Sequence, residues 1–195
     1  MWKNVPIIML FALLVYFIIP ESTMNRPPGI LVYEAPLQKD LRHQKTFVQQ
    51  EYFITPLAQF SLKARVLSKK WYRWKKDGKL VPLDLALGWG KMSDSSVLEK
   101  LKINQSGRKY YWSSKQIPIP ENEISLCSAN MHIIPANDFI LSTLKKIRKG
   151  HIVRLSGFLV QIQDEKGRKW ASSLTRQDVG KGACELVWVQ NIHLE

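Results

Sequence analysis

The sequence predicts a mainly β protein of the α+β class, in which one N-terminal transmembrane helix precedes a single β-rich domain. Three observations predict this arrangement. Residues 5–19 form an unbroken apolar run. From Tyr52 onward, apolar residues recur at every second position, which is the period of a strand with one buried face. Only two later stretches, near Ser93 and at 138–149, have the spacing of short amphipathic helices.

The apolar run has the length of the hydrophobic region of a secretory signal and just suffices to span a thin bilayer. Signal peptidase requires a small residue three positions before its cut, and Pro20 or Glu21 would occupy that position. We therefore expect residues 1–20 to be an uncleaved anchor rather than a removed signal segment. Lys3, with no acid before the run, predicts a cytoplasmic N-terminus in a bacterial inner membrane and a periplasmic domain.

Residues 21–45 are rich in proline and charge and have few periodic apolar positions, so they predict a linker that lifts the domain off the membrane. Residues 46–195 are numerous enough for one domain with a sizeable core. This extracytoplasmic domain begins near Phe47, where apolar periodicity first appears.

Alternation through residues 60–66 predicts a strand. Asp77 and Gly78 then predict a hairpin turn, because glycine accepts the positive φ of tight turns. A second strand should follow, and residues 88–90 interrupt it with two glycines.

The middle of the chain combines short elements. Ser93 is expected to cap a brief helix. Residues 107–113 have strand character, whereas 117–120 must be extended at an edge or in a loop because proline removes ladder donors. Asn137 should cap the clearest helix, at 138–149.

The C-terminal part is a succession of strands. Residues 151–162 predict a long strand interrupted by Gly157, 164–167 a turn, and 168–174 and 185–192 two further strands. A long glycine-interrupted strand directly after a helix, followed by a hairpin and a final strand, resembles one half of a small closed barrel such as an OB-fold. A β-meander is the alternative.

A formal net charge of +13 attracts phosphates, anionic lipid headgroups and acidic polymers at long range. One stretch, at 69–76, interleaves this charge with aromatic rings, a composition suited to stacking on bases or sugars and equally to a membrane interface. Strand alternation would instead place half of the rings in the core. The predicted binding residues are Lys69, Lys70, Trp71, Arg73, Trp74, Lys75 and Lys76.

His132 is the histidine that a catalytic hypothesis would use, together with Arg176 or Asp178. Other partners of the required chemistry are Ser172, Ser173, Cys184 and Glu185. No spacing links any of them to His132, so a structural hydrogen-bonding role is the simpler interpretation. Isolated carboxylates such as Asp84 are interpreted as caps or surface charges.

Three further features are weak in the sequence. Cys127 and Cys184 would suit a disulfide in an oxidising compartment, but equally two small buried hydrophobes. The glycine-rich loop at 175–183 lacks the P-loop pattern and more simply makes a tight turn. The histidines have no metal-ligand spacing, and we expect neither a metal nor a cofactor.

Three stretches, at 82–94, 128–135 and 154–189, resemble an uncharacterised family of bacterial exported or membrane-anchored proteins. This resemblance implies a setting in the bacterial envelope. It implies no activity, ligand or residue role.

Together these observations favour a non-enzymatic, membrane-anchored protein that binds anionic lipid, an envelope polymer or a protein partner through a basic, aromatic surface. The alternatives are an exported hydrolase or nuclease using His132, and a surface nucleic-acid-binding module with an OB-like face. The nucleic-acid hypothesis requires at least two exposed rings among Trp71, Tyr72, Trp74, Tyr111 and Trp112.

Overall fold

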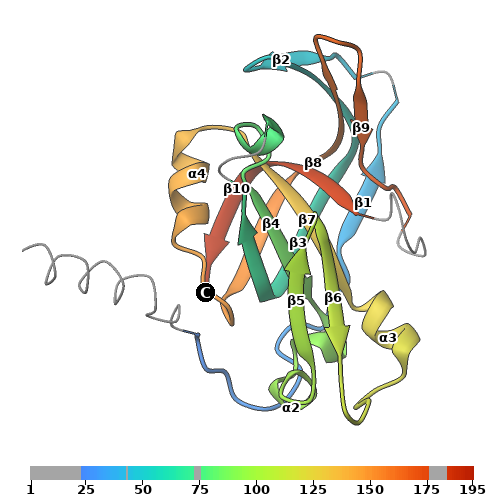
Figure 1. Cartoon of the computed structure of the whole chain (residues 1–195), viewed down its shortest axis with the longest axis vertical. Helices are drawn as coiled ribbons and strands as arrows, with labels where there is room; N and C mark the ends of the chain where they lie inside the picture. Colours follow the sequence, from blue (N-terminus) through green and yellow to red (C-terminus); the bar gives the residue numbers. More distant parts are fainter. Residues whose placement is uncertain (1–22, 43, 73–75, 176–183) are drawn as a thin grey trace, which may run out of the picture.

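The computed structural model describes residues 23–42, 44–72, 76–175 and 184–195 (Figure 1). The predicted anchor at 1–20 lies outside the described residues. Within them, no helix is long and apolar enough to cross a membrane. The described chain is mainly β, which confirms the predicted fold class.

Five strands form a closed ring of hydrogen-bonded neighbours (Figure 1). In spatial order they are β3 (Tyr52–Trp71), β4 (Leu83–Gly88), β7 (Ser128–Pro135), β10 (Glu185–Leu194) and β8 (Ile152–Asp164), and β8 pairs again with β3. β7 and β10 are parallel, and every other pair in the ring is antiparallel. The ring is therefore a small β-barrel.

The length of β3 allows the ring to close. Residues 52–65 pair with β8, and residues 65–71 pair with β4. The register shifts between Pro56 and Ala58 and again between Val66 and Ser68, and such bulges bend a strand and increase its twist. One strand thereby serves two neighbours at different parts of its length.

Alternation along the strands divides apolar from polar side chains. Leu83, Leu85 and Leu87 of β4 enter the barrel core, so Asp84 and Ala86 face outward. The other strands contribute inward residues in the same way: Ala58, Phe60, Leu62, Met131, Ile133, Leu155, Leu159, Val187 and Val189.

A hairpin of β5 (Lys102–Ser106) and β6 (Lys109–Ser113) covers the outer face of β4 and β7 (Figure 1). Ile103, Tyr110 and Trp112 pack in one cluster with Ala86 of β4. The sequence predicted the second strand of this hairpin but not the first.

Three α-helices are described, where the sequence predicted two. α4 (Asp138–Lys145) begins where expected, because the Asn137 side chain accepts a hydrogen bond of 3.0 Å from the amide of Ile140. α3 (Glu121–Leu126) was not predicted.

The cap of α2 (Ser95–Leu98) differs from the expectation: Asp94, not Ser93, caps the helix by accepting from the amide of Ser96. The Ser93 hydroxyl instead accepts from two backbone amides of the N-terminal segment. Two short 3-10 turns, η1 (Lys76–Gly78) and η2 (Gly90–Ser93), lie on either side of β4 in the chain.

The predicted linker at 21–45 is wrong for its described residues. Val32 is buried in the barrel cluster, and its amide hydrogen-bonds to Ser93. β1 (Leu37–Asp40) pairs with β3, as does β2 (Phe47–Gln49). Proline is disfavoured in a central strand but is tolerated in an extended segment that pairs on one side only. The proline-rich composition therefore did not distinguish this segment from a linker.

Candidate functional site: a buried polar cluster under the hairpin

Asp84 and His132 occupy paired positions on neighbouring strands, with both side chains on the outer face of the barrel. The Nδ1 atom of His132 lies 2.8 Å from Oδ1 of Asp84. Their side chains are 3% and 1% exposed, so this contact is sealed from solvent. Interpreting Asp84 as a cap or a surface charge was therefore wrong, because the β5–β6 hairpin covers this face.

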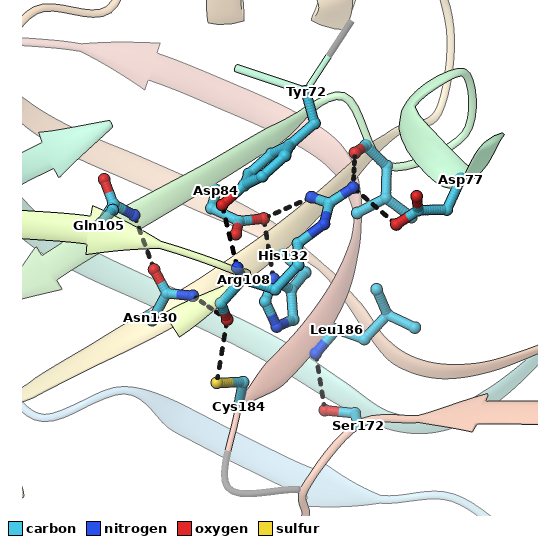
Figure 2. A network of polar contacts seen from close by, with 11 residues as sticks. Tyr72, Asp77, Asp84, Gln105, Arg108, Asn130, His132, Ser172, Cys184 and Leu186 are labelled. Carbon is cyan, nitrogen blue, oxygen red and sulfur yellow. Dashed lines mark hydrogen bonds and ion pairs between the residues drawn. The ribbon is translucent and has the colours of Figure 1, made fainter. Parts of the chain in front are cut away.

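Arg108 at the hairpin turn supplies the compensating charge (Figure 2). Its Nη1 lies 2.7 Å from Oδ1 of Asp84, and its Nη2 lies 2.8 Å from both Oδ2 of Asp77 and the carbonyl oxygen of Val81. The guanidinium also lies 3.8 Å from the centroid of the Tyr72 ring, a cation–π contact. No local pattern in the sequence indicates this role for Arg108.

The backbone of Arg108 is held in an unfavourable conformation. Gly107 has φ 58° and Arg108 has φ 65°, both in the left-handed region that a two-residue hairpin turn requires. For a residue with a Cβ this conformation costs about 1–2 kcal/mol. The amide of Arg108 donates to the Tyr72 hydroxyl, and its carbonyl accepts from Asn130, so backbone contacts as well as the ion pairs offset that cost.

The edge of the cluster is aromatic and amide-lined. The Trp170 ring lies edge-on to His132, with centroids 4.8 Å apart, and 5.8 Å from the Arg108 guanidinium. Gln105 donates to the Asn130 side chain across 2.7 Å. Burial raises the pKa of Tyr72, so its hydroxyl stays protonated at neutral pH. The cluster thus fastens the hairpin to the barrel by charge, hydrogen bonds and ring contacts.

A histidine held by an aspartate has the arrangement of a catalytic dyad. The whole His132 residue is only 2% exposed, however, which denies a substrate access to its ring. The Ser172 hydroxyl already donates to the carbonyl of Ser173 and accepts from the amide of Leu186. Burial and the neighbouring Glu185 raise the pKa of the Cys184 thiol, which disfavours the nucleophilic thiolate.

Arg176 and Asp178, the predicted partners of His132, lie outside the described residues, as does most of the glycine-rich loop. Neither cysteine forms a disulfide. Cys127 ends α3, beside Gly90, whereas the Cys184 thiol lies 3.9 Å from the carbonyl oxygen of Arg108. In the described part of the chain, no group of side chains could hold a metal ion.

The described part of the 69–76 stretch is not the open basic surface that the sequence predicted. Lys69 donates through Nζ to the carbonyl of Ile147, Trp71 packs against the barrel cluster, and Tyr72 is buried under Arg108. Lys70 is exposed. Lys69, Trp71 and Tyr72 are thus engaged by the rest of the domain, and Lys70 alone among the described side chains of this stretch is open to solvent. Arg73, Trp74 and Lys75 lie outside the described residues, and the side chain of Lys76 is not described.

An exposed basic face occurs instead on the hairpin. Its inward positions carry Ile103, Gln105, Tyr110 and Trp112, whereas Lys102, Asn104, Lys109 and Tyr111 face solvent, with Tyr111 52% exposed and paired with Asn104. Lysines also flank the hairpin at 100 and 115, and residues 100–115 contain no Asp or Glu. Of the five rings that the nucleic-acid hypothesis considered, Tyr111 alone is classed as exposed among those that are described.

No family model matches the chain, and no curated protein matches it. Neither its activity nor its site residues can be transferred from a relative. Its function is therefore inferred from its own geometry and charge.

Proposed function

We propose that this chain is a non-enzymatic, membrane-anchored binding protein of the bacterial envelope, and that it binds an anionic envelope polymer through the outer face of the β5–β6 hairpin. The observation that carries this proposal is the hairpin face itself, where Lys102 and Lys109 flank the exposed ring of Tyr111 with no carboxylate in the segment. Such a face combines long-range attraction of anions with a ring for stacking on sugars.

The strand order supports an OB-like interpretation of the barrel. OB-folds are five-stranded Greek-key barrels that bind oligosaccharides and oligonucleotides on the face of their second and third strands. The ring β3-β4-β7-β10-β8, with a parallel β7–β10 pair and α4 between β7 and β8, is consistent with that arrangement. On this interpretation the ligand face is that of β4 and β7.

The hairpin lies on that face, so a ligand approaching from this side meets the hairpin first. Arg108 pins its turn, and Tyr110, two residues further along β6, shares a hydrogen bond of 2.6 Å with Ser128. Fixing the hairpin through its turn and through Tyr110 pre-organises Lys109 and Tyr111, which reduces the entropy lost on binding. The apolar run at 5–19 and the family resemblance support the envelope setting.

The test is binding of the full chain, kept in a nonionic detergent, to peptidoglycan fragments, teichoic acid and single-stranded DNA at low and high salt. We expect binding to an envelope polymer that weakens steeply with salt. Replacing Lys102 and Lys109 by glutamine and Tyr111 by serine should weaken it at least about tenfold, since each lysine near an anionic surface contributes about 1 kcal/mol.

A matched control exists on α4, which exposes two lysines and one aromatic ring, Lys145, Lys146 and Phe139. The same three kinds of substitution there should leave the affinity unchanged. Equal losses in the two variants, or binding that is insensitive to salt, would refute the hairpin as the binding face. Tighter binding of single-stranded DNA than of either polymer would instead favour the nucleic-acid hypothesis.

A further inference from the structure

A second cationic site lies at the start of the described chain. A cavity of about 410 Å³ is enclosed by residues 23–26, the middle of β3, the turn after α2 and the segment that follows α4. Its polar lining includes Arg26, Arg65, Ser95 and Lys149, with Glu99 as the carboxylate. Its apolar lining includes Leu67, Leu98, Leu101 and Ile103.

Arg65 is a buried cation, 7% exposed, whose position is fixed. Its Nη1 donates to the carbonyl of Ser93 across 2.9 Å and to the hydroxyl of Ser95 across 2.8 Å. Both acceptors are neutral, so neither compensates the charge. Burial, together with the nearby Arg26, lowers the pKa of Arg65. A buried guanidinium beside a second cation is stabilised by an anion placed between them.

The N-terminal segment closes one side of the cavity through specific contacts. The amide of Met24 donates to the carbonyl of Lys149 across 2.8 Å, and the Arg26 Nε donates to the carbonyl of Gly150 across 3.0 Å. The Ser95 hydroxyl donates to the carbonyl of Arg26. A Cβ at Gly150 would lie 2.0 Å from the carbonyl oxygen of Met24, so only glycine permits this close approach.

Charge around the cavity is unbalanced. Within the described residues, Arg65 and Lys149 form no ion pair with a carboxylate, and Glu99 is exposed at the rim. Arg26 contacts the main-chain oxygen of Glu195 through Nη2, which leaves its Nε on the carbonyl of Gly150. The same excess of positive charge acts on His151. Burial lowers the pKa of its imidazole, and the nearby cations Arg148, Arg26 and Lys69 lower it further. The cavity therefore has a positive potential within fixed walls.

We propose that this cavity binds a phosphate group, and that the phosphate belongs to an anionic glycerophospholipid. Guanidinium groups form charge-assisted, often bidentate, hydrogen bonds with phosphate oxygens. Leu98, Leu101 and Ile103 in the wall suit the apolar part of a lipid better than they suit a free inorganic ion. The cavity contains residues 23–26, and the predicted anchor ends at residue 20, so a few residues of chain place it within reach of lipid headgroups.

The choice of a lipid as the source depends on the proposed membrane anchor, whereas the phosphate site does not. The test uses the full chain in a nonionic detergent, titrated separately with short-chain phosphatidylglycerol, glycerol 1-phosphate and inorganic phosphate, with thermal unfolding as the readout. A ligand that binds only the folded state raises Tm in a saturable way. A second readout is the histidine NMR spectrum, in which a bound phosphate should raise the pKa of His151 because it neutralises the neighbouring cations.

We expect replacement of Arg26 and Lys149 by glutamine to weaken phosphate binding by at least about tenfold, because charge-assisted hydrogen bonds to the phosphate are lost. The control is the double replacement of Lys145 and Lys146 by glutamine, which removes the same charge from α4 outside the cavity. If the Arg26 variant does not fold, the single replacement of exposed Lys149 serves with the same readouts.

Tighter binding of phosphatidylglycerol than of the two soluble ligands identifies the lipid as the source, and equal binding of all three identifies a soluble phosphate compound. Both outcomes support the phosphate site. The proposal is overturned if no phosphate compound shifts Tm or the His151 titration, or if the cavity and control variants lose the same affinity. Polymer binding at the hairpin is measured separately, so either proposal can fail without the other.

Discussion

Replacing Arg108 by methionine should destabilise the fold by about 3–5 kcal/mol, the usual consequence of removing one partner from a buried ion pair. The Asp84 side chain is 1% exposed and would lose its guanidinium partner while keeping the hydrogen bond to His132. The second pair, with Asp77, is 34% exposed on the carboxylate side and contributes at most about 1 kcal/mol. Methionine also has a Cβ, so the cost of the positive φ is present in both proteins and cancels.

The assay is urea unfolding of the full chain in a nonionic detergent, followed by tryptophan fluorescence. Replacing Arg168 by methionine is the matched control, because Arg168 pairs with Asp164 at the surface and is 64% exposed. That change should reduce the free energy of unfolding far less, because solvent screens an exposed ion pair. Adding Asp84→Asn to the Arg108 variant removes the uncompensated charge and should recover part of the loss. Equal costs at 108 and 168, or strict additivity of the two changes, would show that the buried pair is not what fastens the hairpin.

Two further predictions concern the N-terminal segment and the barrel. Replacing Asp94 by alanine should cost about 1 kcal/mol at neutral pH through loss of the α2 cap. Burial alone would raise the pKa of Asp94, but hydrogen bonds from Gly29 and Ser96 lower it below its usual value. The stability that the carboxylate contributes is therefore complete above the pKa of the unfolded state and is lost as pH falls through the pKa of the folded state. The urea midpoints of wild type and variant should therefore converge below about pH 4, and a gap that widens there contradicts this. Replacing Gly157 by alanine should cost about 1–3 kcal/mol or more of folding free energy, because the added Cβ would lie 1.9 Å from the carbonyl oxygen of Trp188. The control is Ser156→Ala, measured in the same urea titration. If Gly157→Ala costs no more than this control, the close contact with Trp188 is not what requires glycine.

Elements with a local cause were predictable from the sequence. The alternation at 60–66 predicted the strand that closes the barrel, and Asn137 predicted the start of α4. Both patterns act over a few residues and need no knowledge of distant contacts. α3 and β5 were missed because each is short and stabilised chiefly by what it packs against.

The polar cluster could not be predicted in the same way, because its members are far apart in the chain. Asp84 lies 24 residues from Arg108 and 48 from His132, and only strand register and the hairpin bring them together. A usable pattern was nevertheless present. Asp84 stands alone in the otherwise uncharged run from Leu80 to Leu87, and a carboxylate within a buried strand requires a cationic or hydrogen-bonding partner elsewhere in the fold.

The same hairpin strand links the two proposed sites. β5 contributes Ile103 to the wall of the cavity, whereas its neighbour Lys102 points to the outer face. A lipid in the cavity would therefore contact the strand that presents Lys102, one of the two proposed polymer-binding lysines. If occupation of the cavity restricts β5, the polymer should bind more tightly to the lipid-bound chain, and by linkage the lipid should bind more tightly to the polymer-bound chain by the same factor. A domain with this arrangement would bind its polymer ligand more tightly at the membrane than after release from it.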